Sequence, residues 1–198
     1  YFGGAGSIPI PADFDGDQKA DLAVYRPALG IWTVSQSSLG YNVVSGVLGG
    51  PSYLPLTGDF DEDDKADGIV YSESAGHLVA ALSGSFASFR RVPYSLIEAG
   101  YGGPGFSMLV DDYDGDGCSD VAAYDRAGGL WFIMNYKREP IVWGMPWGGA
   151  NCNPISGDFD GDGLADVSFF YRDLHNALWQ LNESTDGPRT VSARNLRP

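Results

Sequence analysis

Basic residues, cysteines and long apolar runs are all scarce in this sequence of 198 residues. Lys and Arg total 12 against 26 Asp and Glu, which gives a net charge of −14. Because the few basic residues form no stripe, the composition argues against a nucleic-acid partner. No apolar run approaches the roughly 20 residues of a membrane-spanning helix, so we expect no membrane insertion.

Helical periodicity and the common catalytic motifs are also missing. No window places apolar residues at helical spacing over the length of a stable helix. Neither a G-x-S-x-G motif nor a phosphate-binding P-loop occurs. Gly100-x-Gly102-x-x-Gly105 matches the dinucleotide-binding fingerprint in form, but no βαβ pattern surrounds it. The sequence therefore favours an all-β protein and gives no motif for an enzyme.

One acidic string occurs four times at nearly constant spacing. It reads DFDGDQKAD at 13–21, DFDEDDKAD at 59–67, DYDGDGCSD at 112–120 and DFDGDGLAD at 158–166, and the first aspartates are 46, 53 and 46 residues apart. A Gly-Gly pair stands ten residues before each string, at 3–4, 49–50, 102–103 and 148–149. A fixed period of this kind indicates a repeat architecture. We place the repeats at about 3–48, 49–101, 102–147 and 148–198.

Each repeat has room for four short strands. One precedes the acidic string, as at 155–159, and two apolar runs follow it, the second of them at 31–34, 78–82, 130–134 and 178–181. A weaker run, such as 141–143, leads to the next Gly-Gly pair. Pro9, Pro55 and Pro154 precede the first aspartate by four residues, and proline in a sheet is tolerated mainly on edge strands. The pattern is typical of β-propeller blades. We predict a single all-β domain, a β-propeller of four-stranded antiparallel blades with four blades in this chain.

The acidic string fits a calcium loop that differs from the EF-hand. An EF-hand needs a bidentate glutamate at the twelfth position, where the repeats have Val24, Val70, Ala123 and Phe169. The ligand set must therefore close at the ninth position. Carboxylates at the first, third, fifth and ninth positions, with a backbone carbonyl from the seventh, provide the hard oxygen ligands that Ca²⁺ prefers. The predicted ligands are Asp13, Asp15, Asp17, Lys19 and Asp21; Asp59, Asp61, Asp63, Lys65 and Asp67; Asp112, Asp114, Asp116, Cys118 and Asp120; and Asp158, Asp160, Asp162, Leu164 and Asp166.

We expect up to four Ca²⁺ ions with a structural role. A catalytic metal keeps an open ligand position beside an acid or base, whereas these loops repeat regardless of any cleft and join the first two strands of each predicted blade. Without a cation the carboxylates repel one another, so an empty loop should be loose. The second loop has Glu62 and Asp64 where the fourth has Gly161 and Gly163, and we expect it to bind in altered geometry or more weakly.

With Phe2-Gly3-Gly4-Ala5-Gly6 ahead of the first acidic string, the chain resembles the FG-GAP or VCBS repeat family. Members of that family form the calcium-binding β-propeller at the head of integrin α chains. The resemblance covers essentially the whole chain and implies the same fold and the same structural use of calcium. Family propellers usually have more blades than this chain supplies. A compact ring, half of a ring completed by a partner, and a segment of a longer protein all stay open.

Three functions are consistent with these features. The first, which we favour, is a non-enzymatic binding or adhesion module for a protein or glycan. Millimolar calcium outside cells suits such loops, so we expect an extracellular protein, secreted or at the cell surface. The second is a structural subunit that assembles with copies of itself into a ring, array or filament. The third is a polysaccharide-active enzyme, whose site should depart from the repeat, and the clearest departure is the insertion around 94–100.

Some single residues carry narrower predictions. Exposed aromatic residues could stack on sugars, and the candidates are Trp143, Trp147, Tyr101 and Tyr136. His77 and His175 occupy similar turns, which indicates repeat geometry more than a metal pair, and Asn182 begins a glycosylation sequon. Cys118 and Cys152 fall at opposite ends of predicted strands, so we expect free thiols or a bond between subunits.

Overall fold

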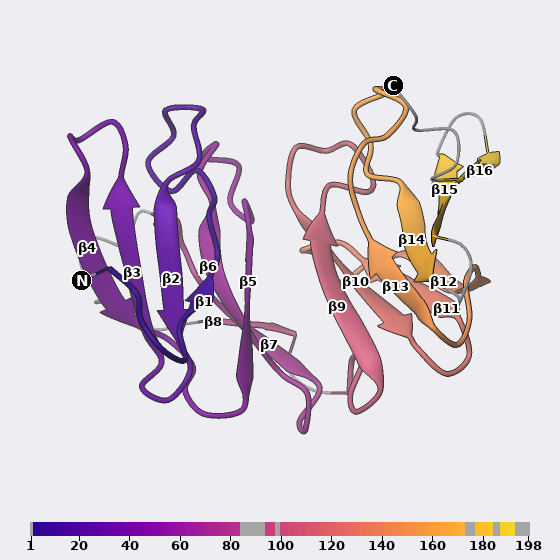
Figure 1. Cartoon of the computed structure of the whole chain (residues 1–198), viewed down its shortest axis with the longest axis horizontal. Helices are drawn as coiled ribbons and strands as arrows, with labels where there is room; N and C mark the ends of the chain where they lie inside the picture. The colour runs from indigo at the N-terminus through magenta and orange to yellow at the C-terminus, as the bar shows by residue number, and fades with distance from the viewer. Residues whose placement is uncertain (1, 84–93, 98–99, 173–176, 184–186, 193–198) are drawn as a thin grey trace. The chain divides into compact units, whose positions relative to one another are not determined.

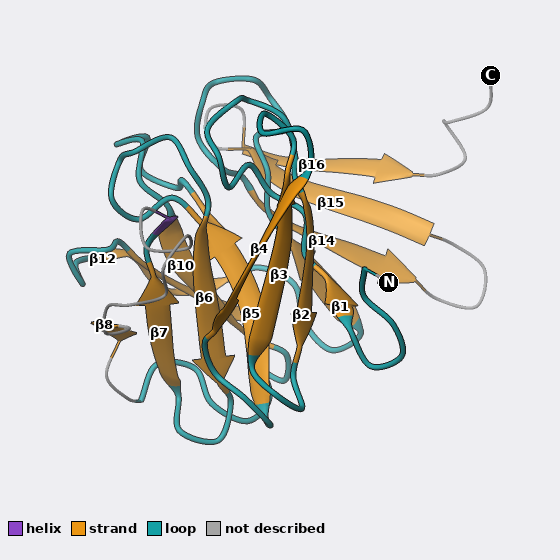
Figure 2. Cartoon of the chain, turned by 90° about the vertical axis from the view of Figure 1, so that its left-hand side faces the viewer, coloured by secondary structure: helices purple, strands orange, loops and turns teal. Residues whose placement is uncertain are grey.

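The computed structural model describes residues 2–83, 94–97, 100–172, 177–183 and 187–192. Its strands form four sheets, each of four antiparallel strands in sequential order (Figure 1). Strands and loops make up nearly all of the described chain (Figure 2). The described residues include a 3₁₀ turn at Ser83 and no α-helix. Within the same residues no helix is long and apolar enough to cross a membrane. The predicted all-β class with antiparallel sheets is confirmed.

The chain divides into two compact units, Tyr1–Pro104 and Gly105–Pro198, and each unit holds two sheets. The first unit contains β1 (Ile8–Pro9), β2 (Leu22–Arg26), β3 (Ile31–Gln36) and β4 (Asn42–Val47) in one sheet, and β5 (Tyr53–Gly58), β6 (Asp67–Ser72), β7 (His77–Ala81) and β8 (Tyr94–Ile97) in the other. The second unit contains β9 (Phe106–Asp111), β10 (Asp120–Asp125), β11 (Leu130–Met134) and β12 (Pro140–Pro146), and β13 (Cys152–Ile155), β14 (Val167–Arg172), β15 (Ala177–Glu183) and β16 (Gly187–Ser192).

Alternating burial explains why these segments are strands. In β2, Ala23 and Tyr25 are buried while Leu22 and Arg26 are exposed, and β3 buries Trp32 and Val34 in the same way. A period of two residues places one face of a strand on a core. The three prolines lie on β1, β5 and β13, each of which is the edge strand of its sheet, as expected.

One predicted strand boundary is wrong. The strand expected at 155–159 ends at Ile155, because β13 spans Cys152–Ile155. Gly157 turns the chain with a φ of 149°, and the Phe159 N–H donates to Oδ2 of Asp166 at 2.7 Å instead of joining a strand ladder. The insertion expected around 94–100 contributes β8, the last strand of the second sheet.

Each unit has a hydrophobic core between its two sheets. In the first unit Tyr25, Trp32 and Leu48 pack with Val70 and Ala81 of the next repeat. In the second unit Tyr124, Trp131 and Ile133 pack with Ala165 and Val167 of the next repeat. The same tyrosine and tryptophan positions thus build both cores, with ring centroids 5.1 Å apart for Tyr25 and Trp32 and 5.0 Å apart for Tyr124 and Trp131.

A tyrosine near the end of the second strand hydrogen-bonds to the Gly-Gly pair that opens the next repeat. The Tyr124 hydroxyl donates to the Gly149 carbonyl at 3.1 Å and accepts from the Gly149 N–H at 2.8 Å. The Tyr25 hydroxyl makes the same two bonds to Gly50, at 3.2 and 3.0 Å, and the Tyr71 hydroxyl accepts from the Gly103 N–H at 2.6 Å. This contact gives the repeated glycines a structural role that the sequence did not reveal.

The first glycine of the pair has no room for a side chain. Gly49 has a φ of 79°, a region that favours glycine, and a Cβ there would lie 2.8 Å from the Tyr25 hydroxyl and 2.9 Å from Cγ1 of Val70. Gly148 has a φ of 115°, and its Cβ would collide with the Tyr124 hydroxyl. The Gly-Gly pair is therefore the surface on which the tyrosine of the preceding repeat rests.

Removing the hydroxyl of Tyr124 should destabilise the second unit. Tyr124→Phe keeps the ring but leaves the N–H and carbonyl of Gly149 without their partner, so we expect the free energy of unfolding to fall by about 1 to 2 kcal/mol in urea titrations. The matched control is Tyr41→Phe, because the Tyr41 side chain is 63% exposed, and it should change stability by less than about 0.5 kcal/mol. Equal losses in the two variants would contradict the assigned role.

Candidate functional site

Each acidic string forms a loop between the first two strands of its sheet and gathers three carboxylates. In every loop, three aspartates offer one carboxylate oxygen each, and these oxygens lie within 4.8 Å of one another. The clusters are Asp13, Asp15 and Asp17; Asp59, Asp61 and Asp67; Asp112, Asp114 and Asp120; and Asp158, Asp160 and Asp166. An oxygen-only cluster of this kind suits a hard cation such as Ca²⁺ or Mg²⁺.

The clusters contain part of each predicted ligand set. The first- and third-position aspartates are present in all four. In the first loop the third member is the fifth-position Asp17, and Asp21 lies outside the cluster. In the other loops the third member is the ninth-position aspartate, and the fifth-position residues Asp63, Asp116 and Asp162 lie outside.

The ninth-position aspartates also close the loops by hydrogen bonds. All four are almost fully buried, and Oδ2 of each accepts the N–H of the second residue of its loop. The bonds are Phe14 to Asp21 at 3.0 Å, Phe60 to Asp67 at 2.9 Å, Tyr113 to Asp120 at 2.8 Å and Phe159 to Asp166 at 2.7 Å. The alternating acidic pattern indicated ligands only. This anchoring role requires the loop to curl back on itself, which no linear spacing reveals.

The second carboxylate oxygen of Asp120 distinguishes the third loop from the first two. Oδ1 of Asp21 accepts the Ser37 N–H at 2.7 Å, and Oδ1 of Asp67 accepts the Ser83 N–H at 2.5 Å. Oδ1 of Asp120 is buried without a hydrogen-bond partner among the described residues. Leaving a buried carboxylate oxygen without a partner is costly, so an atom of this kind next to two further carboxylates fits a bound cation.

Burial and neighbouring charge alter the acidity of these groups. The pKa of Asp120 is raised to about 7, chiefly by burial and also by the charges of Asp114, Asp112 and Asp116, while the hydrogen bond from Tyr113 lowers it. Burial likewise raises the pKa of Asp67 to about 7, although two backbone N–H groups favour its ionised form. A nearby positive charge would favour the ionised form of both carboxylates, and a divalent cation would supply that charge.

The fifth-position aspartates are held by the seventh residue and by lysines. The N–H groups of the four predicted carbonyl ligands donate to them: Lys19 to Asp17 at 2.9 Å, Lys65 to Asp63 at 3.1 Å, Cys118 to Asp116 at 2.9 Å and Leu164 to Asp162 at 2.8 Å. Ammonium groups lie beside three of them, in the pairs Lys19–Asp17 at 3.2 Å, Lys65–Asp63 at 3.1 Å and Lys137–Asp116 at 3.5 Å. A hydrogen bond from Ser37 lowers the pKa of Asp17.

The second loop reaches the backbone conformation of the others without glycine. Glu62 and Asp64 have φ values of 60° and 59°, and the equivalent Gly161 and Gly163 have 82° and 91°. A side chain in this left-handed region costs about 1 to 2 kcal/mol relative to the right-handed one. The second loop therefore carries local strain that the fourth loop avoids.

Relieving that strain should stabilise the protein. We expect Glu62→Gly to have a free energy of unfolding about 0.5 to 1 kcal/mol above that of Glu62→Gln, because glycine adopts a positive φ freely but has more freedom to lose on folding. Glu62→Gln is the proper reference, since it removes the same charge and keeps the side chain. Urea denaturation in a chelator measures both variants. A glycine variant less stable than the glutamine variant would refute the strain.

The aromatic candidates fall into different environments. Trp143, on β12, is 64% exposed, and its ring meets that of Phe132 edge-on, with centroids 5.3 Å apart and an interplanar angle of 82°. Tyr101 is buried, and Trp147 is half-buried against Phe169. Tyr136 is half-buried with the Lys137 ammonium 4.5 Å from its ring centroid. Of the four, Trp143 presents its ring to solvent.

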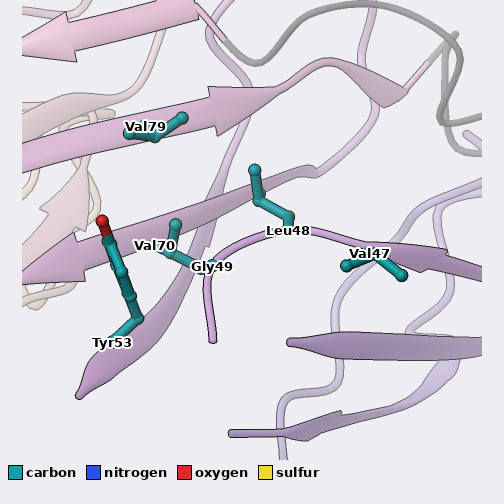
Figure 3. A pocket seen from close by; sticks show the side chains of 6 residues that line it. All are labelled: Val47, Leu48, Gly49, Tyr53, Val70 and Val79. Atoms are coloured by element: carbon teal, nitrogen blue, oxygen red, sulfur yellow. The ribbon is translucent and has the colours of Figure 1, made fainter. Parts of the chain in front are cut away.

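A cavity of about 260 Å³ lies in the first unit (Figure 3). Tyr53 of β5, Val70 of β6 and Val79 of β7 line one side, and 47–49, where β4 ends, line the other. The lining is mainly apolar. The Tyr53 hydroxyl lies 3.1 Å from Nε2 of His77, so these two polar groups satisfy each other. His77 is thus a packing partner of Tyr53, while His175 lies outside the described residues.

Both cysteines of the second unit are free thiols. Cys118 is buried within the third loop, and Cys152 is half-buried at the start of β13, where burial raises the pKa of its thiol. Asn182 lies on β15, and Ser184 of its sequon lies outside the described residues. Residues 100–105, which carry the formal dinucleotide fingerprint, connect β8 to β9 without a helix.

No protein-family model matches the chain, and no curated protein matches it. Among solved structures, the chain is similar to a lectin from Agrocybe aegerita that specifically recognises non-reducing terminal N-acetylglucosamine, with a TM-score of 0.62 and 14% sequence identity. The match covers 94% of this chain and 52% of the lectin chain, so this chain spans about half the lectin's length. At this identity the likeness concerns the fold.

Proposed function

We propose that this chain is an extracellular, calcium-stabilised β-propeller module that binds a glycan without catalysing a reaction on it. The likeness of 94% of the chain to the fold of a lectin carries the proposal. The residues that resemble FG-GAP or VCBS repeats support the same fold. A non-enzymatic role is favoured because the acidic clusters recur in all four loops and so are not tied to a single reactive site.

The sheets have the features of consecutive blades. Each is a four-stranded meander in sequential order, and in each unit the tyrosine of one sheet hydrogen-bonds to the Gly-Gly pair that opens the next repeat. Since this chain spans 52% of the lectin chain, we propose that the complete ring has more blades than these four. A second copy of the chain or further repeats of the same kind would supply them.

Calcium is the cation that the loops would hold. The ligands would be the three clustered aspartates of each loop, and the set would be completed by the seventh-position carbonyl and by the remaining aspartate, which is Asp21 in the first loop and the fifth-position aspartate in the others. Ca²⁺ accepts such flexible sets of six to eight oxygens, whereas Mg²⁺ demands a near-ideal octahedron. The bound ion would supply the positive charge that lets Asp67 and Asp120 stay ionised inside the fold.

Calcium should raise the melting temperature of the protein relative to a chelator. A site saturated at one hundred times its dissociation constant stabilises the native state by about 2.7 kcal/mol, so filling even one loop should shift the midpoint by several degrees. Differential scanning calorimetry in CaCl₂, MgCl₂ and EDTA at equal ionic strength makes the measurement, and Mg²⁺ should shift the midpoint less. An unchanged midpoint in CaCl₂ would remove the calcium part of the proposal.

Trp143 is the side chain best placed to stack on a sugar ring. Its indole is 64% exposed and is supported from behind by Phe132, so little side-chain freedom is lost when a ligand covers it. Two register shifts between β11 and β12, together with Gly144 at a φ of 75°, bend the strand at this point. Bulges of this kind re-aim side chains, and here the result is an outward-facing tryptophan.

A glycan array in CaCl₂ should identify at least one ligand class. We expect Trp143→Ala to weaken binding to that ligand about tenfold or more, in line with the loss of one aromatic stacking contact. Tyr41→Ala is the matched control, because Tyr41 is 63% exposed and lies between β3 and β4, outside the strands β11 and β12 that carry Trp143 and Phe132, and it should bind as the wild type does. Light scattering of the same samples gives the number of copies. A blank array, in protein that calcium stabilises, would leave a protein ligand as the alternative.

A further inference from the structure

One backbone hydrogen bond joins the two acidic loops of each unit. In the second unit the N–H of Ala165, at the eighth position of the fourth loop, donates to the carbonyl of Asp112 at 2.6 Å. In the first unit the N–H of Ala66 donates to the carbonyl of Asp13, also at 2.6 Å. Asp112 and Asp13 are the first-position aspartates of their loops. Each therefore contributes its carboxylate to its own cluster and its carbonyl to the following loop.

In each unit the residue that donates this bond directly precedes the closing aspartate of the later loop. Ala165 precedes Asp166, whose carboxylate belongs to the fourth cluster, and Ala66 precedes Asp67, whose carboxylate belongs to the second cluster. The Asp166 N–H is fixed in turn by the Gly157 carbonyl at 2.8 Å. The placement of each closing carboxylate thus depends on the first aspartate of the preceding loop.

Side chains reinforce the contact between loops. In the second unit Leu164 packs so closely on Gly115 that a Cβ at Gly115 would lie 2.5 Å from it. Ala165 is buried in the same core cluster as Tyr113 of the third loop. In the first unit the stem of Lys65 fills the equivalent place, 3.1 Å from a Cβ built on Gly16. The two loops of a unit are therefore packed directly against each other.

We propose that the two loops of each unit bind cations cooperatively, the first with the second and the third with the fourth, so that a cation in one loop raises the affinity of the other. The inference rests on the proposed calcium binding. In the third loop, binding is further supported by the buried Oδ1 of Asp120, which has no partner in the described chain.

The coupling arises because a cation bound in one loop orders part of the neighbouring loop. A cation that fixes the Asp112 carboxylate also fixes its carbonyl, and through Ala165 it pre-forms the position of Asp166. The neighbouring loop then loses less conformational freedom when it binds its own cation. Linkage requires the reverse effect to be equal, so removing the fourth site must weaken the third. Coupling between sites is commonly worth a factor of about 5 to 150, and we expect about tenfold here.

Tyr113 offers a reporter for a single loop. It occupies the second position of the third loop, where the other loops have Phe14, Phe60 and Phe159. Terbium has oxygen-ligand preferences like those of calcium, and its luminescence is sensitised by a nearby tyrosine. Titrating the whole chain with Tb³⁺ under excitation of tyrosine therefore measures the third loop preferentially, and Tyr113→Phe identifies that part of the emission.

The test removes one carboxylate from the fourth loop and measures Tb³⁺ binding at the third loop. We expect Asp160→Asn to weaken Tb³⁺ binding at the third loop about tenfold. Asp111→Asn removes an equal charge beside the third and fourth loops without belonging to either cluster, and its effect should be clearly smaller than that of Asp160→Asn.

The possible results separate this inference from the proposed function. If Asp160→Asn binds Tb³⁺ at the third loop as the wild type does, or if Asp111→Asn weakens that binding as strongly as Asp160→Asn does, the two loops are not coupled. Calcium binding itself then still stands. If calorimetry with Ca²⁺ and luminescence with Tb³⁺ detect no binding to the wild type, both the coupling and the calcium role are refuted. A tenfold loss confined to Asp160→Asn supports the pairing.

Discussion

The hydrogen bonds between a tyrosine hydroxyl and the glycine pair of the next repeat set the spacing on which the rest of the structure depends. Beside the pairs at 49–50 and 148–149 the chain is also held by backbone bonds, because the N–H of Leu48 donates to the Gly30 carbonyl at 2.8 Å and that of Trp147 to the Gly129 carbonyl at 2.9 Å. The indole N–H groups of Trp32 and Trp131 donate to the Leu48 and Trp147 carbonyls, at 3.3 and 2.8 Å. Because the segment that contains the glycine pair is hydrogen-bonded on both sides, an insertion or deletion within it would break these bonds.

These hydrogen bonds explain why each acidic loop follows its Gly-Gly pair at a constant distance in the sequence. The Gly-Gly pair fixes the start of the first strand, and the ninth-position aspartate fixes the turn that follows it by accepting an N–H from the second residue of the loop. In the sequence, the extra residues of the second repeat fall between Ser83 and the Gly-Gly pair at 102–103, a stretch that includes β8. The difference in repeat length thus falls after the third strand, outside the acidic loop and the glycine pair.

The sequence predicted most of the features that recur in every repeat, but few of the contacts between one repeat and the next. Strand class, the edge prolines and the positions of the acidic loops follow from spacing alone. The strand at 155–159 was misplaced, because Phe159 is apolar but its N–H is used by Asp166 and not by a ladder. The double use of Asp112, the burial of Tyr101 and the linking of loops in pairs all depend on contacts between distant segments. A linear pattern holds no information about such contacts.

Equivalent positions with different side chains are where the repeats acquire distinct surfaces. Tyr53, Val70 and Val79 line the cavity of the first unit, and their counterparts in the third sheet are Phe106, Ala123 and Phe132. There the larger rings of Phe106 and Phe132 approach each other at 6.2 Å and continue to Trp143. The same backbone therefore presents a small apolar hollow in one repeat and a row of aromatic rings in another. The repeated skeleton, with its tyrosine, glycines and aspartates, is the same in both, so any selectivity for a ligand must reside in the side chains that the skeleton leaves free to vary.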